Sequence, residues 1–136
     1  MGDQRVLEGG CLCGAVRYAI QGEPLGSVIC HCRSCQRASS APRLAFIGVS
    51  AGCFVLTSGT PVEYVSSPGV TRTFCGRCGS PLTYRRTGEP GSLDVTTISL
   101  DDPDAVSPTH HSWLEDAAGW DRLAGDLPTF TRSSRG

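Results

Sequence analysis

Three cysteines lie within six residues, at Cys30, Cys32 and Cys35. Packing alone does not explain such a concentration of thiols, which indicates a metal site. In an extended segment, side chains two residues apart lie on one face, and the turn that follows brings the third sulfur back toward the first two. Zn²⁺ takes four donors in a tetrahedron, so three thiolates leave one position for water, a small molecule or another residue.

Two cysteine pairs flank this stretch at a distance. Cys11 and Cys13 form a Cys-x-Cys motif between glycines, and Cys75 and Cys78 form a Cys-x-x-Cys motif. Together the pairs supply four thiolates, a complete shell for a structural zinc that would tie the N-terminal segment to the middle of the chain. A redox disulfide between Cys75 and Cys78 is the alternative, but no βαβ pattern surrounds that pair.

The three-cysteine group has two interpretations. It is a second structural site if a histidine or Cys53 supplies a fourth ligand, and an open site if the fourth ligand is exchangeable. Cys53 stands in an apolar run, which favours a small buried side chain over a ligand. His31 falls between two ligands and should point away from the metal. His110 and His111, beside Trp113, are candidates either to line a pocket or to be solvated.

The composition favours short strands over long helices, because 17 glycines and 9 prolines break up the 136 residues. We expect one mainly β domain over residues 5–130, followed by a frayed tail at 131–136. The expected strands are 15–20, 27–29, 44–49, 53–57, 62–65, 71–74, 82–84 and 93–98, with 44–49 and 53–57 in the core. Short helical turns are expected at 33–40 and 101–106, and loops over the sheets at 108–130.

Charge excludes several classes of function. The formal net charge is −1, so no basic field attracts nucleic acid. No lysine is present to form a Schiff base with a carbonyl substrate. The sequence shows neither an apolar signal segment nor a run long enough to span a membrane. We therefore expect a cytoplasmic protein without a membrane partner, in which reduced cysteines are metal ligands more often than disulfides.

Arginines gather near the proposed ligands. They can compensate the negative charge that three or four thiolates leave on a zinc site, or receive the carboxylates of an anionic substrate. Salt-bridged surface arginines are the ordinary alternative. The arginines within four residues of a cysteine in these groups are Arg17, Arg33, Arg37, Arg72 and Arg77.

At this point the pattern resembles a known family, the glutathione-dependent formaldehyde-activating enzymes, whose domain also occurs in centromere protein V. The matching segments run over nearly the whole chain, and the ordered two, three and two cysteines are highly specific. They are residues 10–18 (GCLCGAVRY), 30–35 (CHCRSC), 59–61 (GTP), 66–69 (SSPG), 72–82 (RTFCGRCGSPL) and 127–130 (LPTF).

The resemblance implies a β-tent zinc fold of small antiparallel sheets and two zinc ions per chain. A structural zinc would be held by Cys11, Cys13, Cys75 and Cys78, and a second, catalytic zinc by Cys30, Cys32 and Cys35. The implied reaction joins formaldehyde to glutathione as S-(hydroxymethyl)glutathione, which is carbon–sulfur lyase chemistry on a small thiol adduct. No catalytic residue beyond the second zinc's ligands is indicated.

Two questions stay open from the residues. A metal that already holds three thiolates is a weak Lewis acid, so activation of a thiol is favoured over polarisation of the aldehyde. A non-catalytic, zinc-stabilised binding module is the alternative to an enzyme. Neither the true substrate nor the oligomeric state is indicated by the sequence.

Overall fold

The computed structural model describes residues 5–121 and 131–132. The expected motif at 127–130 and the tail at 133–136 lie outside the described residues. The strands are β1 Val6–Gly10, β2 Arg17–Gln21, β3 Gly26–Cys30, β4 Leu44–Ser50, β5 Phe54–Ser58, β6 Val62–Ser67, β7 Val70–Phe74, β8 Pro81–Arg86, β9 Ser92–Thr96 and β10 His110–Ser112. The helix is α1 Arg33–Ser39, and the 3-10 turns are η1 Ala51–Cys53, η2 Thr97–Ser99 and η3 Leu114–Asp116.

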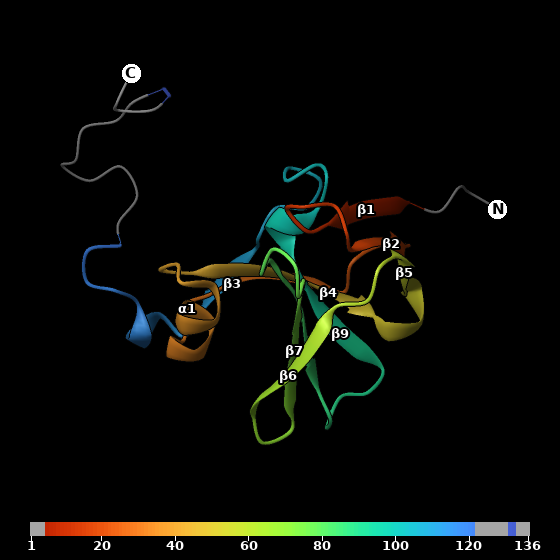
Figure 1. Ribbon diagram of the computed structural model, residues 1–136. Coiled ribbons are helices and arrows are strands. Elements are labelled where there is room, and N and C mark those ends of the chain that lie inside the picture. The colour runs from red at the N-terminus through yellow and green to blue at the C-terminus, as the bar shows by residue number, and fades with distance from the viewer. Residues whose placement is uncertain (1–4, 122–130, 133–136) are drawn as a thin grey trace.

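The described strands form two sheets (Figure 1). The smaller sheet has the order β1-β2-β5, and the larger has the order β10-β3-β4-β9-β8-β7-β6. Neighbouring strands pair antiparallel, except that β10 runs parallel to β3. The expected mainly β fold of small sheets with short helical turns is confirmed.

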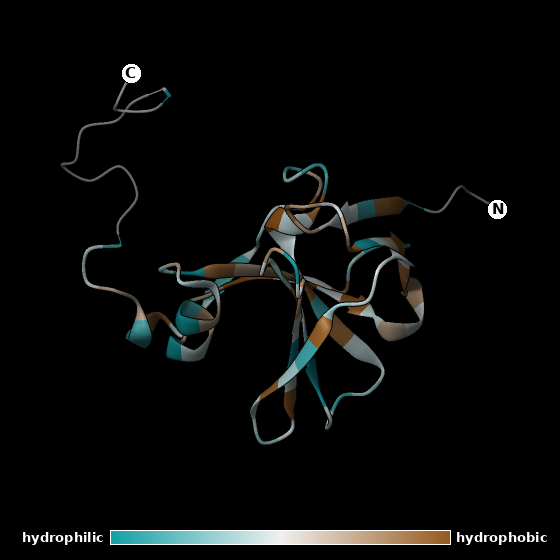
Figure 2. Ribbon diagram, viewed as in Figure 1, coloured by the Kyte–Doolittle hydropathy of each residue, from teal (hydrophilic) through white to brown (hydrophobic). Residues whose placement is uncertain are grey.

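The hydrophobic core lies where the two sheets face each other. Alternate residues of β2, such as Tyr18 and Ile20, pack against alternate residues of β4 and β9, such as Ile47 and Val95. This alternation follows from the two-residue repeat of a strand, which sends successive side chains to opposite faces. Figure 2 shows hydrophobic residues along the strands, whereas α1 is largely hydrophilic. The opposite face of the larger sheet is left for a site.

Three details differ from the expectations. The run 53–57 is not core, because β5 is an edge strand whose residues after Phe54 are exposed. Residues 101–106 form turns instead of a helical turn, with the backbone N–H of Asp104 bonded to the Asp102 side chain. The stretch from 108 to 121 is more regular than a loop, since it contains β10 and η3.

The topology delivers the cysteine motifs to two places. β3 ends at Cys30 and leads directly into α1, while the loop between β7 and β8 carries Cys75 and Cys78. In the described part of the chain, no helix has the length and apolar character needed to cross a membrane.

Candidate metal centres

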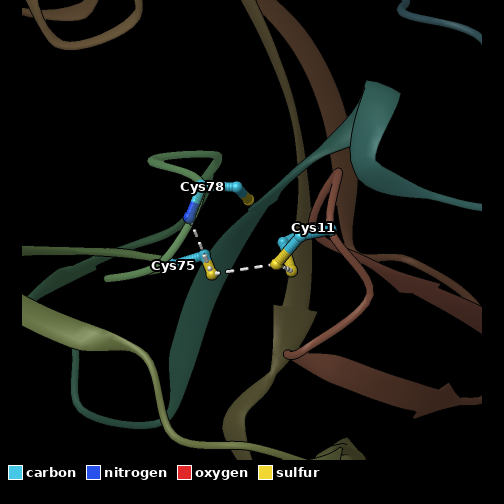
Figure 3. A group of neighbouring side chains, drawn as sticks. Cys11, Cys75 and Cys78 are labelled. Carbon is cyan, nitrogen blue, oxygen red and sulfur yellow. Dashed lines mark hydrogen bonds between the residues drawn. The ribbon is translucent and has the colours of Figure 1, made fainter.

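Four cysteine sulfurs from two distant segments meet at the first centre. The Sγ atoms of Cys11 and Cys13 lie 3.6 Å apart, and those of Cys13 and Cys75 lie 3.8 Å apart. Cys78 completes a group whose sulfurs all lie within 4.8 Å of one another. Zn–S bonds of about 2.3 Å in a tetrahedron put sulfurs about 3.8 Å apart, so the group has the size of a four-thiolate shell. Figure 3 shows Cys75 and Cys78 facing Cys11 across the gap between the two loops.

Backbone amides support these sulfurs. The N–H of Val16 donates to Cys11 Sγ at 3.2 Å, and the N–H groups of Arg77 and Cys78 each lie 3.4 Å from Cys75 Sγ. Hydrogen bonds from the Ser80 side chain and backbone lower the pKa of Cys78 to about 5. The surroundings of Cys78 therefore favour its thiolate form, which is the form that binds a metal. The pKa of Cys13, by contrast, is lowered by a backbone hydrogen bond but raised on balance to about 11 by desolvation and the neighbouring sulfurs.

The second centre holds three sulfurs. Cys30, Cys32 and Cys35 lie within 4.8 Å of one another, at the end of β3 and the start of α1. Cys32 is the N-cap of α1, and its Sγ accepts from the backbone N–H of Cys35 at 3.3 Å. Among the residues that the structure describes, no fourth Cys, His, Asp or Glu joins this group. The chain therefore offers four donors at one centre and three at the other.

The residues considered as a fourth ligand lie elsewhere. Cys53 ends η1 and belongs to neither group. His31 turns away from the sulfurs, and its Nε2 lies 2.9 Å from Nδ1 of His111 on β10. His110 is exposed on the same strand.

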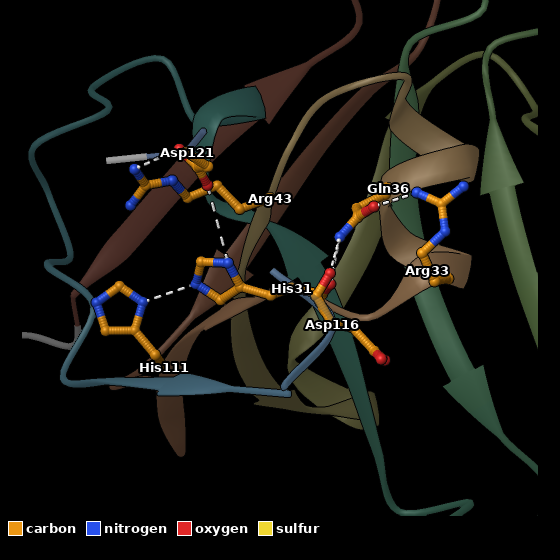
Figure 4. Close-up of polar contacts among 7 residues, drawn as sticks. All are labelled: His31, Arg33, Gln36, Arg43, His111, Asp116 and Asp121. Atoms are coloured by element: carbon orange, nitrogen blue, oxygen red, sulfur yellow. Dashed lines mark hydrogen bonds and ion pairs between the residues drawn. The ribbon is translucent and has the colours of Figure 1, made fainter. Parts of the chain in front are cut away.

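His31 links the three-cysteine loop to the chain after β10. Its ring lies between His111 and Asp121, whose Oδ2 is 3.9 Å from His31 Nδ1, and Arg43 pairs with the other Asp121 oxygen at 3.0 Å (Figure 4). Burial lowers the pKa of His31, and His111 and Arg43 act in the same direction. The hydrogen bond between His31 and His111 therefore ties the three-cysteine loop to β10.

Gln36 makes a second link to the same segment. This buried side chain donates through Nε2 to the carbonyl oxygens of His31 at 2.6 Å and Asp116 at 2.9 Å, and its Oε1 accepts from Arg33 (Figure 4). Trp113, between these anchors, is in the left-handed backbone conformation with φ 62°. Such strain in a non-glycine residue costs about 1–3 kcal/mol and persists where surrounding contacts enforce it.

A cavity of about 420 Å³ opens beside the three sulfurs. Its walls come from α1, all seven strands of the larger sheet and the segment after β10, so the cavity lies on the sheet face opposite the core. Lining residues other than the cysteines include Arg72, Tyr84, Arg86, Asp94, Trp113 and Asp116.

Arg72 is the cation that reaches the sulfurs. Its Nη2 lies 3.6 Å from Cys35 Sγ, its Nε donates to Ser66 Oγ at 3.2 Å, and its guanidinium carbon stands 4.8 Å from the centre of the Tyr84 ring. Burial raises the pKa of the Cys35 thiol to about 12, and the hydrogen bond from Arg72 opposes that rise. Arg72 therefore supplies the charge compensation expected of an arginine near the thiolates.

The other arginines near the cysteines have different roles. Arg17 makes a two-pronged ion pair with Asp101, at 2.7 and 2.6 Å, and is not available to a substrate. Arg33 bonds Gln36 but also lines the 420 Å³ cavity. Arg37 lines a neighbouring cavity of about 580 Å³, and Arg77 is exposed on the Cys75–Cys78 loop.

Sequence reasoning missed Tyr84 and Asp94 and left Trp113 unassigned. Tyr84 and Asp94 reach the cavity through strand pairing, and Trp113 through the parallel strand β10, which no short-range pattern indicates. Alternation along residues 92–96 does predict that Asp94 faces away from buried Leu93 and Val95. The alternation therefore predicts the face of the sheet on which Asp94 lies, but not which side chains of other strands lie beside it.

A family model described as glutathione-dependent formaldehyde-activating enzyme matches residues 6–116. A fission yeast (Schizosaccharomyces pombe) protein named an uncharacterized lyase is 37% identical over 81 residues, which are 59% of this chain and 58% of the relative. The chain thus matches less than two thirds of that relative's length. A crystal structure of a Rhodobacter sphaeroides protein shares the fold, with a TM-score of 0.63 at 20% identity over 77% of this chain and 99% of that one.

Proposed function

The chain belongs to the glutathione-dependent formaldehyde-activating enzyme family, and from this premise we propose that it is a zinc-dependent carbon–sulfur lyase-class enzyme acting on a small thiol adduct. The proposed reaction is the formation of S-(hydroxymethyl)glutathione from glutathione and formaldehyde. The name of the fission yeast relative, a lyase, supports the reaction class.

The observation that carries the proposal is the difference between the two cysteine groups. Cys11, Cys13, Cys75 and Cys78 form a complete shell, whereas Cys30, Cys32 and Cys35 are one donor short and stand beside a cavity. A closed four-thiolate shell is typical of structural zinc, and a shell with three protein ligands is typical of catalytic zinc. We therefore propose two zinc ions per chain, one structural and one with an exchangeable position.

Zinc fits both donor sets, since sulfur-only shells at this spacing favour it over hard cations. A zinc ion at the second centre would lower the pKa of a thiol that completes its shell and make it nucleophilic at neutral pH.

The chain's own residues bind and orient the thiol compound. Arg72 offers its guanidinium at the sulfur end of the cavity, and Arg33 and Arg86 add positive charge along the walls. Glutathione is an anionic tripeptide, and guanidinium groups receive carboxylates well. A volume of about 420 Å³ lies within the usual range for small-molecule sites.

The location of the protein is part of the same proposal. A cytoplasmic setting supplies reduced glutathione and keeps thiols reduced. All eight cysteines are free thiols in the structure.

The test is an exchange measurement on the zinc-loaded protein. Formaldehyde and glutathione combine unaided, so nuclear magnetic resonance exchange spectroscopy would compare the rate of adduct formation with and without protein. We expect the wild-type protein to accelerate exchange, Cys32→Ser to abolish the acceleration, and Cys53→Ser, outside both groups, to retain it. Exchange at the uncatalysed rate with two zinc ions bound would overturn the proposal and favour a binding module.

A further inference from the structure

Residues of five strands form one row across the larger sheet. The register pairs Gly26 with Gly48, Gly48 with Asp94, Asp94 with Tyr84, and Tyr84 with Arg72. Directly paired residues share a face of the sheet, so Asp94 stands on the same face as Tyr84 and Arg72. The two glycines leave the space beside the carboxyl open, and a Cβ added at Gly48 would lie 3.4 Å from Asp94 Oδ1.

Asp94 lies where two cavities meet. It lines the 420 Å³ cavity of the three cysteines and also a polar pocket of about 160 Å³. Tyr84 and Arg86 also line both cavities, whereas Glu89 lines the polar pocket but not the larger cavity. The carboxyl is therefore accessible from the sulfur side and from a second, polar side.

No cation holds Asp94 in an ion pair within 4.0 Å in the described part of the chain. The two arginines on this face contact Tyr84 instead, with Arg86 Nε 3.1 Å from Tyr84 Oη and Arg72 over the ring. Burial raises the pKa of Asp94, Arg86 opposes the rise, and Glu89 adds to it. Gly48, the partner on β4, contributes no charge. A carboxylate becomes a more effective base as its pKa approaches the working pH.

We propose that the Asp94 carboxylate is the proton-transfer group of the three-cysteine cavity, taking the proton of the thiol and returning it to the aldehyde oxygen. This inference rests on the proposed function and names a catalytic residue for it. It is carried by the position of Asp94 on the sheet row, at the junction of the two spaces.

The proposed step balances without a further reactant. The thiol S–H bond breaks, its proton goes to Asp94, and the electron pair stays on sulfur. Sulfur then forms a bond to the formaldehyde carbon, while the carbonyl π pair moves to oxygen. That oxygen takes the proton from Asp94, which leaves a hydroxymethyl thioether and the original carboxylate. Nothing is oxidised or reduced.

The test compares Asp94→Asn with Asp104→Asn, a change of the same chemistry on an exposed turn, in zinc-loaded protein. We expect Asp94→Asn to bind two zinc ions and to lower kcat by about a hundredfold or more, the scale of general acid–base catalysis, with a small change in KM. Asp104→Asn should match the wild type. The fall of kcat/KM at acid pH, set by protonation of Asp94, should disappear in Asp94→Asn, and Asp94→Glu should restore part of the rate.

A second readout needs no turnover. In protein labelled with ¹³C-aspartate, the Asp94 carboxyl resonance should shift when glutathione alone is added, while that of Asp104 should not. An unmoved Asp94 resonance, or an Asp94→Asn variant with wild-type kcat and pH profile beside an active wild type, would overturn the role of Asp94 and leave the proposed function standing. A wild-type protein without activity would remove the proposed function, and this proton transfer with it.

Discussion

The Arg72 guanidinium on β7 lies 3.6 Å from the Cys35 sulfur on α1, and so joins elements 37 residues apart in the sequence. The stack on Tyr84 and the bond to Ser66 hold the guanidinium in that position. A cation already fixed by these two contacts loses little side-chain freedom when it meets a thiolate. The larger sheet therefore supplies the charge that a three-thiolate centre needs.

Arg72→Gln should weaken zinc binding at the second centre by about tenfold or more, because a hydrogen bond to a charged group contributes about 1.5–3 kcal/mol. Competition with a chromophoric chelator measures this affinity. Arg86→Gln is the matched control, since Arg86 also lies over the Tyr84 ring but makes no hydrogen bond to a sulfur among the described residues. Equal losses in both variants would show that general positive charge, not the contact with Cys35, governs the affinity.

Loss of a ligand should have different consequences at the two centres. Cys75→Ser should unfold the protein, because a closed structural site contributes several kcal/mol of folding energy and ties two segments of the chain. Cys32→Ser should leave the fold intact and weaken only the second metal. Circular dichroism with zinc analysis measures both effects. If the two variants unfold alike, the division between a structural and an open centre is wrong.

The cysteine spacing predicted both groups, because cysteines two or three residues apart are brought together by the local geometry of a strand or a tight turn. The mainly β architecture followed from the alternation along 15–20 and from the continuous apolar run at 44–49. The prediction that residues 53–57 lie in the core was wrong, because the sequence of an apolar edge strand does not differ from that of a core strand.

The walls of the cavity could not be predicted in the same way. Arg72, Tyr84 and Asp94 become neighbours only through the pairing of β7, β8 and β9. Register depends on turn geometry and on the bulge where Leu82 is the extra residue between paired positions. The bond between His31 and His111 likewise depends on the parallel pairing of β10 with β3, 80 residues apart.

Gln36→Leu should loosen the segment after β10 without disturbing the first centre. The change removes the donor that reaches the carbonyl oxygens of His31 and Asp116, and each buried acceptor left without a partner costs about 1–3 kcal/mol. Amide hydrogen exchange should rise at residues 111–117 and stay constant on β2. Unchanged exchange at 111–117 would show that the contacts of His31 and Asp121 suffice to hold the segment.

The ion pair of Arg17 and Asp101 should make stability depend on pH in a defined direction. Hydrogen bonding to Arg17 lowers the pKa of Asp101 in the folded state. Its stabilising effect is therefore present above the unfolded pKa of about 4 and is lost as the pH falls through the lower folded value. Asp101→Asn should lower the melting temperature at pH 7 and pH 5 alike, and the difference from the wild type should shrink below pH 4. A difference that grows on acidification would contradict this account.

The central claim is that the polypeptide completes one metal shell and leaves the other a ligand short. The most direct measurement is a titration of protein carrying cobalt at the second centre with glutathione, followed through the thiolate-to-cobalt charge-transfer absorption. A fourth thiolate should raise that absorption in a saturable way, and S-methylglutathione, which lacks the thiol, should not. A spectrum that glutathione leaves unchanged, with the intensity of four bound thiolates before any addition, would contradict the claim.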